Sequence, residues 1–279
     1  MSEIFNYSFM VNALLVGVLV SVCCALLGVV LVLKRFSMIG DGLAHVSFGA
    51  LSVAAVLNLS MPLYFAIPVV MISAFFLLRI TENSKINADA AIAVISSSAL
   101  SIGVFFASIN GTNINLQQYM FGSILSITDT DIALSVVLSV LVILLYFLFY
   151  HKIFALTFDE NFSFATGIRT KLFNTVISLL TAVTIVIGMR LLGTLLISAL
   201  IIFPPLTSMR LCKRFSTVVI VSSVVSVLCV VTGLVTSFVC ADVPVSATIV
   251  ICNLLLFILF SAVAIIRKIV IHKQKNNHK

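Results

Sequence analysis

The sequence predicts an all-α integral membrane protein with about nine transmembrane helices. Of its 279 residues, 62% are hydrophobic and 9% are charged, whereas a soluble domain carries roughly 25% charged residues. The mean hydropathy is +1.29. Apolar runs of about 20 residues, the length that crosses a bilayer as a helix, follow one another along the chain. We therefore expect one transmembrane domain over residues 1–279, surrounded by membrane lipid.

Charged or turn-forming residues divide the apolar runs into the predicted spans. The first span ends at Lys34-Arg35, and we expect it to be retained because no basic segment of a signal peptide precedes it. The second span ends at a turn over 58–62 and the fifth at His151-Lys152. The nine spans lie at about 9–33, 38–58, 63–80, 88–108, 132–150, 172–189, 191–209, 217–239 and 245–266. If the 189–210 region is miscounted, eight spans remain.

Two segments between the spans have a different character. Residues 109–131 are rich in Gly, Asn and Thr, and their apolar island, 119–127, is too short to cross and predicts an interfacial or re-entrant helix. Residues 153–170 form the longest soluble-looking segment, with amphipathic spacing of its Phe residues. This segment is either a docking element for a cytoplasmic partner or a helix that lies on the membrane surface.

The Lys and Arg residues predict the orientation of the chain. With the N-terminus outside and the C-terminus in the cytoplasm, Arg190 alone lies at the outer side and the other basic clusters lie inside, as the positive-inside rule requires. The net charge of +7 therefore indicates membrane anchoring and not nucleic-acid binding.

Missing motifs argue against several classes of protein. The chain has no GxxxxGK[ST] phosphate loop, so we expect it not to hydrolyse ATP by that route, and it has no HExxH motif of a metalloenzyme. Its six cysteines form no CxxC pair and lie mostly in apolar runs. We therefore expect small buried hydrophobic residues, and not a disulfide framework or a zinc site.

An acid and a histidine lie within the second span, in the run IGDGLAHVSFGA. Asp41 and His45 are four residues apart, so a helix places them on one face. Ionisable groups are costly in a membrane and mark pathways or partners. A carboxylate and an imidazole suit Zn²⁺ or Mn²⁺, but an Asp–His pair that locks helices together or relays protons also explains them. With a helix start near Phe36, His45 would lie roughly 14 Å into the membrane.

Adjacent prolines, Pro204 and Pro205, lie in the seventh span. Each removes a backbone donor and disturbs the helical hydrogen-bond ladder. The result is either a gating hinge or a packing bend.

The run IGDGLAHVSFGA resembles the GD-x-L-AH-x-S signature on the second helix of permease subunits of bacterial zinc and manganese ABC importers, the ABC-3 family. The similarity continues through QQYMFGSILSIT, DENFSFATGI and GTLLISALIIFPP, in the expected order. This resemblance implies a type II permease architecture, like that of vitamin B12 and siderophore importers. It also implies a homodimer in the bacterial inner membrane, a cytoplasmic ABC ATPase dimer and an extracytoplasmic metal-binding protein.

The same resemblance implies roles for individual residues. Asp41 and His45 match the transmembrane metal ligands, Zn²⁺ or Mn²⁺ being cargo and not a permanently bound cofactor. DENFSFATGI matches the EAA-like coupling helix within 153–170. Its candidate contacts to the ATPase are Asp159, Glu160, Phe162, Ala165 and Gly167. Phe164 departs from the small residue common at its position, and Pro204-Pro205 replaces a more usual Pro-Ala.

Two other transport functions remain open at this stage. A permease for a siderophore or cobalamin-like chelate has a similar architecture, but a bulky ligand would not need Asp41 and His45. An ion-coupled secondary transporter would work without an ATPase. A metalloenzyme would require more clustered ligands.

Overall fold

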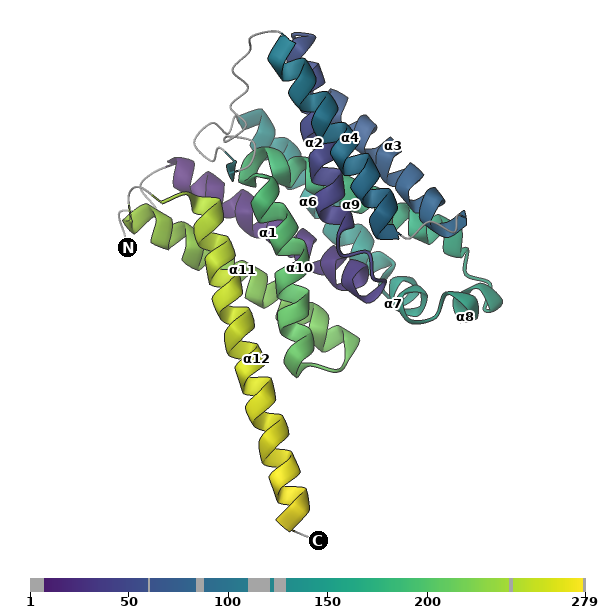
Figure 1. Cartoon of the computed structure of the whole chain (residues 1–279), viewed down its shortest axis with the longest axis vertical. Helices are drawn as coiled ribbons and strands as arrows, with labels where there is room; N and C mark the ends of the chain where they lie inside the picture. The colour runs from purple at the N-terminus through teal and green to yellow at the C-terminus, as the bar shows by residue number, and fades with distance from the viewer. Residues whose placement is uncertain are drawn as a thin grey trace.

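The computed structural model describes residues 8–59, 61–83, 88–109, 121–122, 129–240 and 243–277, and every regular element in these ranges is an α-helix (Figure 1). The helices are α1 Ser8–Leu33, α2 Ile39–Val56, α3 Pro62–Asn83, α4 Ala88–Ile109, α6 Asp129–Leu148, α7 Tyr150–Phe158, α8 Glu160–Ala165, α9 Thr170–Leu192, α10 Thr194–Leu211, α11 Phe215–Val239 and α12 Val245–Asn277. The predicted all-α membrane fold is thereby confirmed.

Eight helices in the described ranges are long and apolar enough to cross a membrane. Helix α3 corresponds to the third predicted span, and its apolar stretch among the residues searched is Pro62–Leu77. The 189–210 region, where we expected the ambiguity, forms two separate helices, because Gly193 adopts a left-handed φ of 89° between α9 and α10.

Helix α1 forms the centre of the bundle. One of its faces contributes to an apolar cluster with α2, α3, α9, α10 and α11, and another contributes to a second cluster with α6, α7, α9 and α11. Cys24 belongs to the first cluster and Cys23 to the second, and both are buried. The expectation of buried, unbridged cysteines is confirmed for these two and for Cys229, whereas Cys240 is exposed.

Helices α2, α3 and α4 lie side by side at one edge of the bundle (Figure 1). Contact between α2 and α4 is close at Gly49, where an added Cβ would lie 2.6 Å from the carbonyl oxygen of Ala99. Small residues allow such approach of membrane helices. This packing fixes the helix that carries Asp41 and His45.

The last helix extends far from the others. Helix α12 packs against α10 and α11 and then continues beyond them to the C-terminal end (Figure 1). The predicted span ended at residue 266, but the helix runs to Asn277. The apolar pattern ends where the basic residues begin, and these residues are themselves good helix formers, so the helix does not stop there.

The two intervening segments differ in how far the structure tests them. The predicted re-entrant island 119–127 lies outside the described residues except for 121–122. The 153–170 segment consists of α7, which follows α6 almost directly, and the short helix α8. At the start of α8, Asp159 caps the helix by accepting a hydrogen bond from the backbone N–H of Phe162 at 2.9 Å.

Candidate functional site

Asp41 and His45 lie on the same face of α2, as their spacing predicts. The distance from His45 Nε2 to Asp41 Oδ2 is 3.6 Å, and the side chains are 30% and 45% exposed for His45 and Asp41 respectively. Helix α2 begins at Ile39, so His45 lies about 9 Å along the helix. The helix start that we expected near Phe36 lies three residues later, because residues 37–38 form a turn and not the first turn of α2.

Ser198 brings a second helix to this pair. Its hydroxyl on α10 donates a hydrogen bond to Asp41 Oδ1 at 3.1 Å. The Gly40 backbone also lies against the Ile201 side chain, since a Cβ added at Gly40 would lie 2.9 Å from Ile201 Cδ1. The start of α2 is therefore held against the first half of α10, and a hydroxyl oxygen joins the carboxylate and the imidazole.

The three side chains offer oxygen and nitrogen ligand atoms that suit a small divalent cation. Bonds of about 2.0–2.2 Å to a tetrahedral ion separate two ligand atoms by roughly 3.3–3.6 Å. The 3.6 Å between His45 and Asp41 is in this range and longer than a normal hydrogen bond. Among the described residues, no group of three or more His, Cys, Asp or Glu side chains surrounds such a position. Two strong donors and a hydroxyl suit an ion in transit better than a tightly held structural metal.

Pro204 and Pro205 are buried on α10, about 9 Å along the helix from Ser198. Proline at 205 leaves the carbonyl of Ile201 without its usual helical donor. Gly28 of α1 lies against that carbonyl, because an added Cβ would be 2.2 Å from the oxygen. This close contact favours a packing bend over a free hinge at the two prolines.

The predicted coupling residues lie on the surface of α8 and the turn after it. Asp159, Glu160, Phe162, Ala165 and Gly167 are all exposed, and Phe162 is 62% exposed although it is aromatic. Gly167 has a φ of 85°, with nothing within 4 Å of an added Cβ. The structure brings these residues together but not to Asp41 and His45.

Sequence reasoning missed several polar contacts between helices. It gave Ser198 and Asn174 no role and assigned Lys34 only to the end of the first span, because the partner of each side chain is distant in the sequence. It also placed Asp131 in the segment 109–131 between two spans. The residue instead lies in the first turn of α6, where its carboxylate is 9% exposed and lies 3.1 Å from Arg190 at the end of α9. Asp89 occupies the first turn of α4.

Comparison with known proteins gives consistent results over nearly the whole chain. The pattern of the ABC 3 transport family matches residues 6–264. The high-affinity zinc uptake system membrane protein ZnuB of Buchnera aphidicola is 33% identical over 242 residues, which are 86% of this chain and 91% of that protein. The manganese transport system membrane protein MntC of Halalkalibacterium halodurans is 26% identical, with 92% and 88% covered. The structure of PsaBC from Streptococcus pneumoniae in complex with Fab superposes with a TM-score of 0.82 at 25% identity, covering 93% of this chain and 94% of that chain.

Proposed function

Because the chain belongs to the ABC 3 transport family, we propose that it is the membrane permease subunit of a bacterial ATP-driven importer of zinc or manganese. The relatives named for zinc and manganese transport support the substrate class. The observation that carries the proposal is the pair Asp41 and His45 on a membrane helix, with Ser198 contributed by a second helix.

The chain acts in transport and not as an enzyme, and ATP hydrolysis belongs to a separate subunit. A cytoplasmic ABC ATPase dimer docks on the permease homodimer, and an extracytoplasmic protein delivers the metal. The exposed set Asp159, Glu160, Phe162, Ala165 and Gly167 forms the surface that contacts the ATPase. An exposed aromatic side chain such as Phe162 is typical of a protein interface, where aromatic residues are enriched.

The orientation of the chain follows from its basic residues. The N-terminus lies outside, the C-terminal end of α12 lies in the cytoplasm, and α8 is then on the cytoplasmic side with the other basic clusters. Metal passes Asp41 and His45 transiently as cargo, so no permanently bound cofactor is required.

Metal measurements in cells test this function. A strain that lacks the gene should contain less zinc or less manganese and should lose uptake of that radioactive ion, while uptake of the other ion and of iron identifies the selectivity. Restoring the intact gene should restore uptake. Gene-dependent uptake of a siderophore or a cobalamin, with no uptake of a free ion, would contradict the proposal and favour the chelate permease.

Dependence of uptake on the ATPase distinguishes an ATP-driven importer from an ion-coupled secondary transporter. Vesicles that contain the permease alone should not accumulate the ion, whereas vesicles with the ATPase, the binding protein and ATP should. Accumulation driven by an ion gradient without the ATPase would show a secondary transporter instead.

A further inference from the structure

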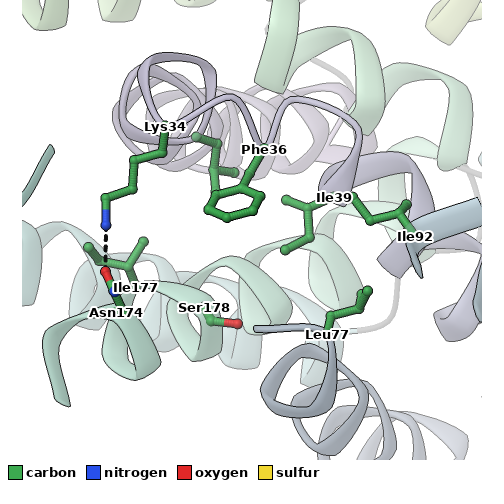
Figure 2. Close-up of a pocket in the computed structure, with 9 residues that line it drawn as sticks. Lys34, Phe36, Ile39, Leu77, Ile92, Asn174, Ile177 and Ser178 are labelled. Atoms are coloured by element: carbon green, nitrogen blue, oxygen red, sulfur yellow. Dashed lines mark hydrogen bonds between the residues drawn. The ribbon is translucent and has the colours of Figure 1, made fainter. Parts of the chain in front are cut away.

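Three polar side chains connect α8 to the turn before α2. Lys34 Nζ donates to Asn174 Oδ1 at 2.5 Å, and Asn174 Nδ2 donates to Glu160 Oε1 at 2.9 Å. Lys34 Nζ also lies 3.7 Å from Glu160 Oε2. Figure 2 shows Lys34 extending from the end of α1 to Asn174 on α9. The link thus joins α8, α9 and the α1–α2 turn.

The α1–α2 turn is short and internally bonded, so Lys34 can position the start of α2. The backbone N–H of Phe36 donates to the carbonyl of Leu31 at 2.8 Å, and Arg35 has a left-handed φ of 62°. This is the hydrogen-bonded turn that commonly ends a helix. Ile39 then donates to the carbonyl of Phe36 at 3.1 Å as α2 begins. Asp41 lies two residues later, in the first turn.

Burial differs along the link. Asn174 is 6% exposed and the Lys34 side chain is 12% exposed, whereas the Glu160 side chain is 47% exposed. A buried ammonium group is stable only where acceptors surround it, so Lys34 is tied to its partners. The Glu160 end instead lies on the α8 surface that we propose contacts the ATPase.

Cavities lie on both sides of the link. Figure 2 shows Phe36, Ile39 and Ile92 lining a pocket under the start of α2. A second pocket of about 340 Å³ lies between Phe36 and the α7–α8 segment, where it is lined by Leu156 and Phe158. Apolar packing therefore leaves space between the turn and α8, and polar side chains bridge it.

We propose that Glu160, Asn174 and Lys34 transmit displacement of α8 to the first turn of α2. In this account Lys34 and Asn174 are positioning residues, which act through Asp41 and His45 without touching the ion. The inference rests on the proposed function, in which α8 receives the motion of the ATPase. The amide suits the middle position because it accepts from Lys34 at one end and donates to Glu160 at the other.

The test measures ions imported per ATP hydrolysed by the complete importer, with its ATPase and binding protein, in proteoliposomes. We expect Lys34→Met and Asn174→Leu to keep ATP hydrolysis within about twofold and to lower the ratio of ions to ATP about tenfold. Arg35→Met is the matched control, since this neighbouring basic residue is exposed, and its ratio should not change.

Exchange of the two charges provides a second variant, which tests whether Lys34 and Glu160 act together on the ion-to-ATP ratio. In the Lys34→Glu/Glu160→Lys double variant, the Asn174 amide can turn end for end and bridge the exchanged charges. We expect this variant to recover a large part of the ratio that each single exchange loses. If Lys34→Met does not assemble with the ATPase, Asn174→Leu and the exchanged pair decide the question.

Three results would overturn the link. The first is an unchanged ion-to-ATP ratio in both Lys34→Met and Asn174→Leu. The second is an ion-to-ATP ratio of the exchanged pair that is as low as that of the worse single exchange, and the third is failure of every variant to assemble, which would show a folding role only. The proposed function has its own readout in the same vesicles. An intact complex that imports neither zinc nor manganese contradicts that function, whereas normal import with an unaffected Lys34→Met ratio contradicts the link alone.

Discussion

Ser198 of α10 donates a hydrogen bond to Asp41 of α2, across a distance of 3.1 Å and 157 residues of sequence. This bond orients one carboxylate oxygen, while the other oxygen faces His45. The helix with the adjacent prolines and the helix with the acid–histidine pair therefore meet at the proposed path. Any relative movement of α2 and α10 changes the geometry that the ion encounters.

Removal of the Ser198 hydroxyl should weaken the apparent affinity for the transported ion without abolishing uptake. Hydrogen bonds to charged groups contribute about 1.5–3 kcal/mol when buried, so for the half-exposed Asp41 carboxylate we expect Ser198→Ala to raise the apparent KM for the ion about three- to tenfold. Initial-rate uptake in vesicles measures this change. Ser223→Ala is the control, because that hydroxyl donates to the Val219 carbonyl of its own helix. Equal KM values for Ser198→Ala and the unaltered protein would show that the bond has no role.

A methyl group at Gly49 should separate α2 from α4. The added Cβ would meet the Ala99 carbonyl oxygen at 2.6 Å, and overpacking of this kind costs about 1–3 kcal/mol. We expect Gly49→Ala to lower the Tm of the purified protein by about 5 °C. At Gly17, by comparison, an added Cβ would meet the Val230 side chain at 3.1 Å, and side chains yield more easily than backbone. Gly17→Ala should therefore change Tm less, and the opposite order would contradict the packing described.

Replacement of Phe162 should remove the ATPase without unfolding the permease. The side chain is 62% exposed, so Phe162→Ser should leave Tm nearly unchanged. Aromatic interface residues often contribute about 2 kcal/mol or more to binding, which corresponds to roughly 30-fold weaker association. Copurification of the ATPase with tagged permease measures the loss.

The control for Phe162 is an exposed apolar residue at the other end of the bundle. Leu57, at the end of α2, is 58% exposed. Leu57→Ser should retain the ATPase. Retention of the ATPase by Phe162→Ser would show that docking does not use this part of α8.

The ion pair between Arg190 and Asp131 should contribute to stability. The Asp131 carboxylate is 9% exposed, and loss of a nearby guanidinium leaves its charge less well compensated. We expect Arg190→Met to reduce the free energy of unfolding by about 2 kcal/mol. Arg169→Met, at an exposed position before α9, should have a smaller effect on Tm. If both substitutions lower Tm equally, the ion pair is not what holds α6 to α9.

The order of the membrane spans and most of their ends could be predicted because these spans are defined by length and charge. Lys34-Arg35 ends α1 in the structure as the sequence indicated, and the turn after 58 separates α2 from α3. The break between α9 and α10 was harder to locate, since it depends on the left-handed backbone at Gly193 in an otherwise apolar run. The extension of α12 beyond residue 266 was missed because the prediction followed hydropathy. The hydropathy falls at the basic residues, whereas their helix propensity stays high.

The candidate site could be predicted only where its residues are close in sequence. A spacing of four residues places Asp41 and His45 on one face of any helix, and the structure shows them there. Contacts between distant helices have no such periodic signal. The bonds from Ser198 to Asp41 and from Lys34 to Asn174 span 157 and 140 residues, and only the packing of the helices brings these side chains together.

Uptake of radioactive zinc and manganese by the complete importer carrying His45→Ala tests whether the metal path runs through Asp41 and His45. We expect this variant to assemble with the ATPase but to import at least about 100-fold more slowly, because the imidazole is one of two strong ligands proposed for the ion. His151→Ala, which removes an exposed imidazole, should import at the normal rate. Import by a fully assembled His45→Ala complex at the rate of the unaltered protein would contradict a metal path through Asp41 and His45.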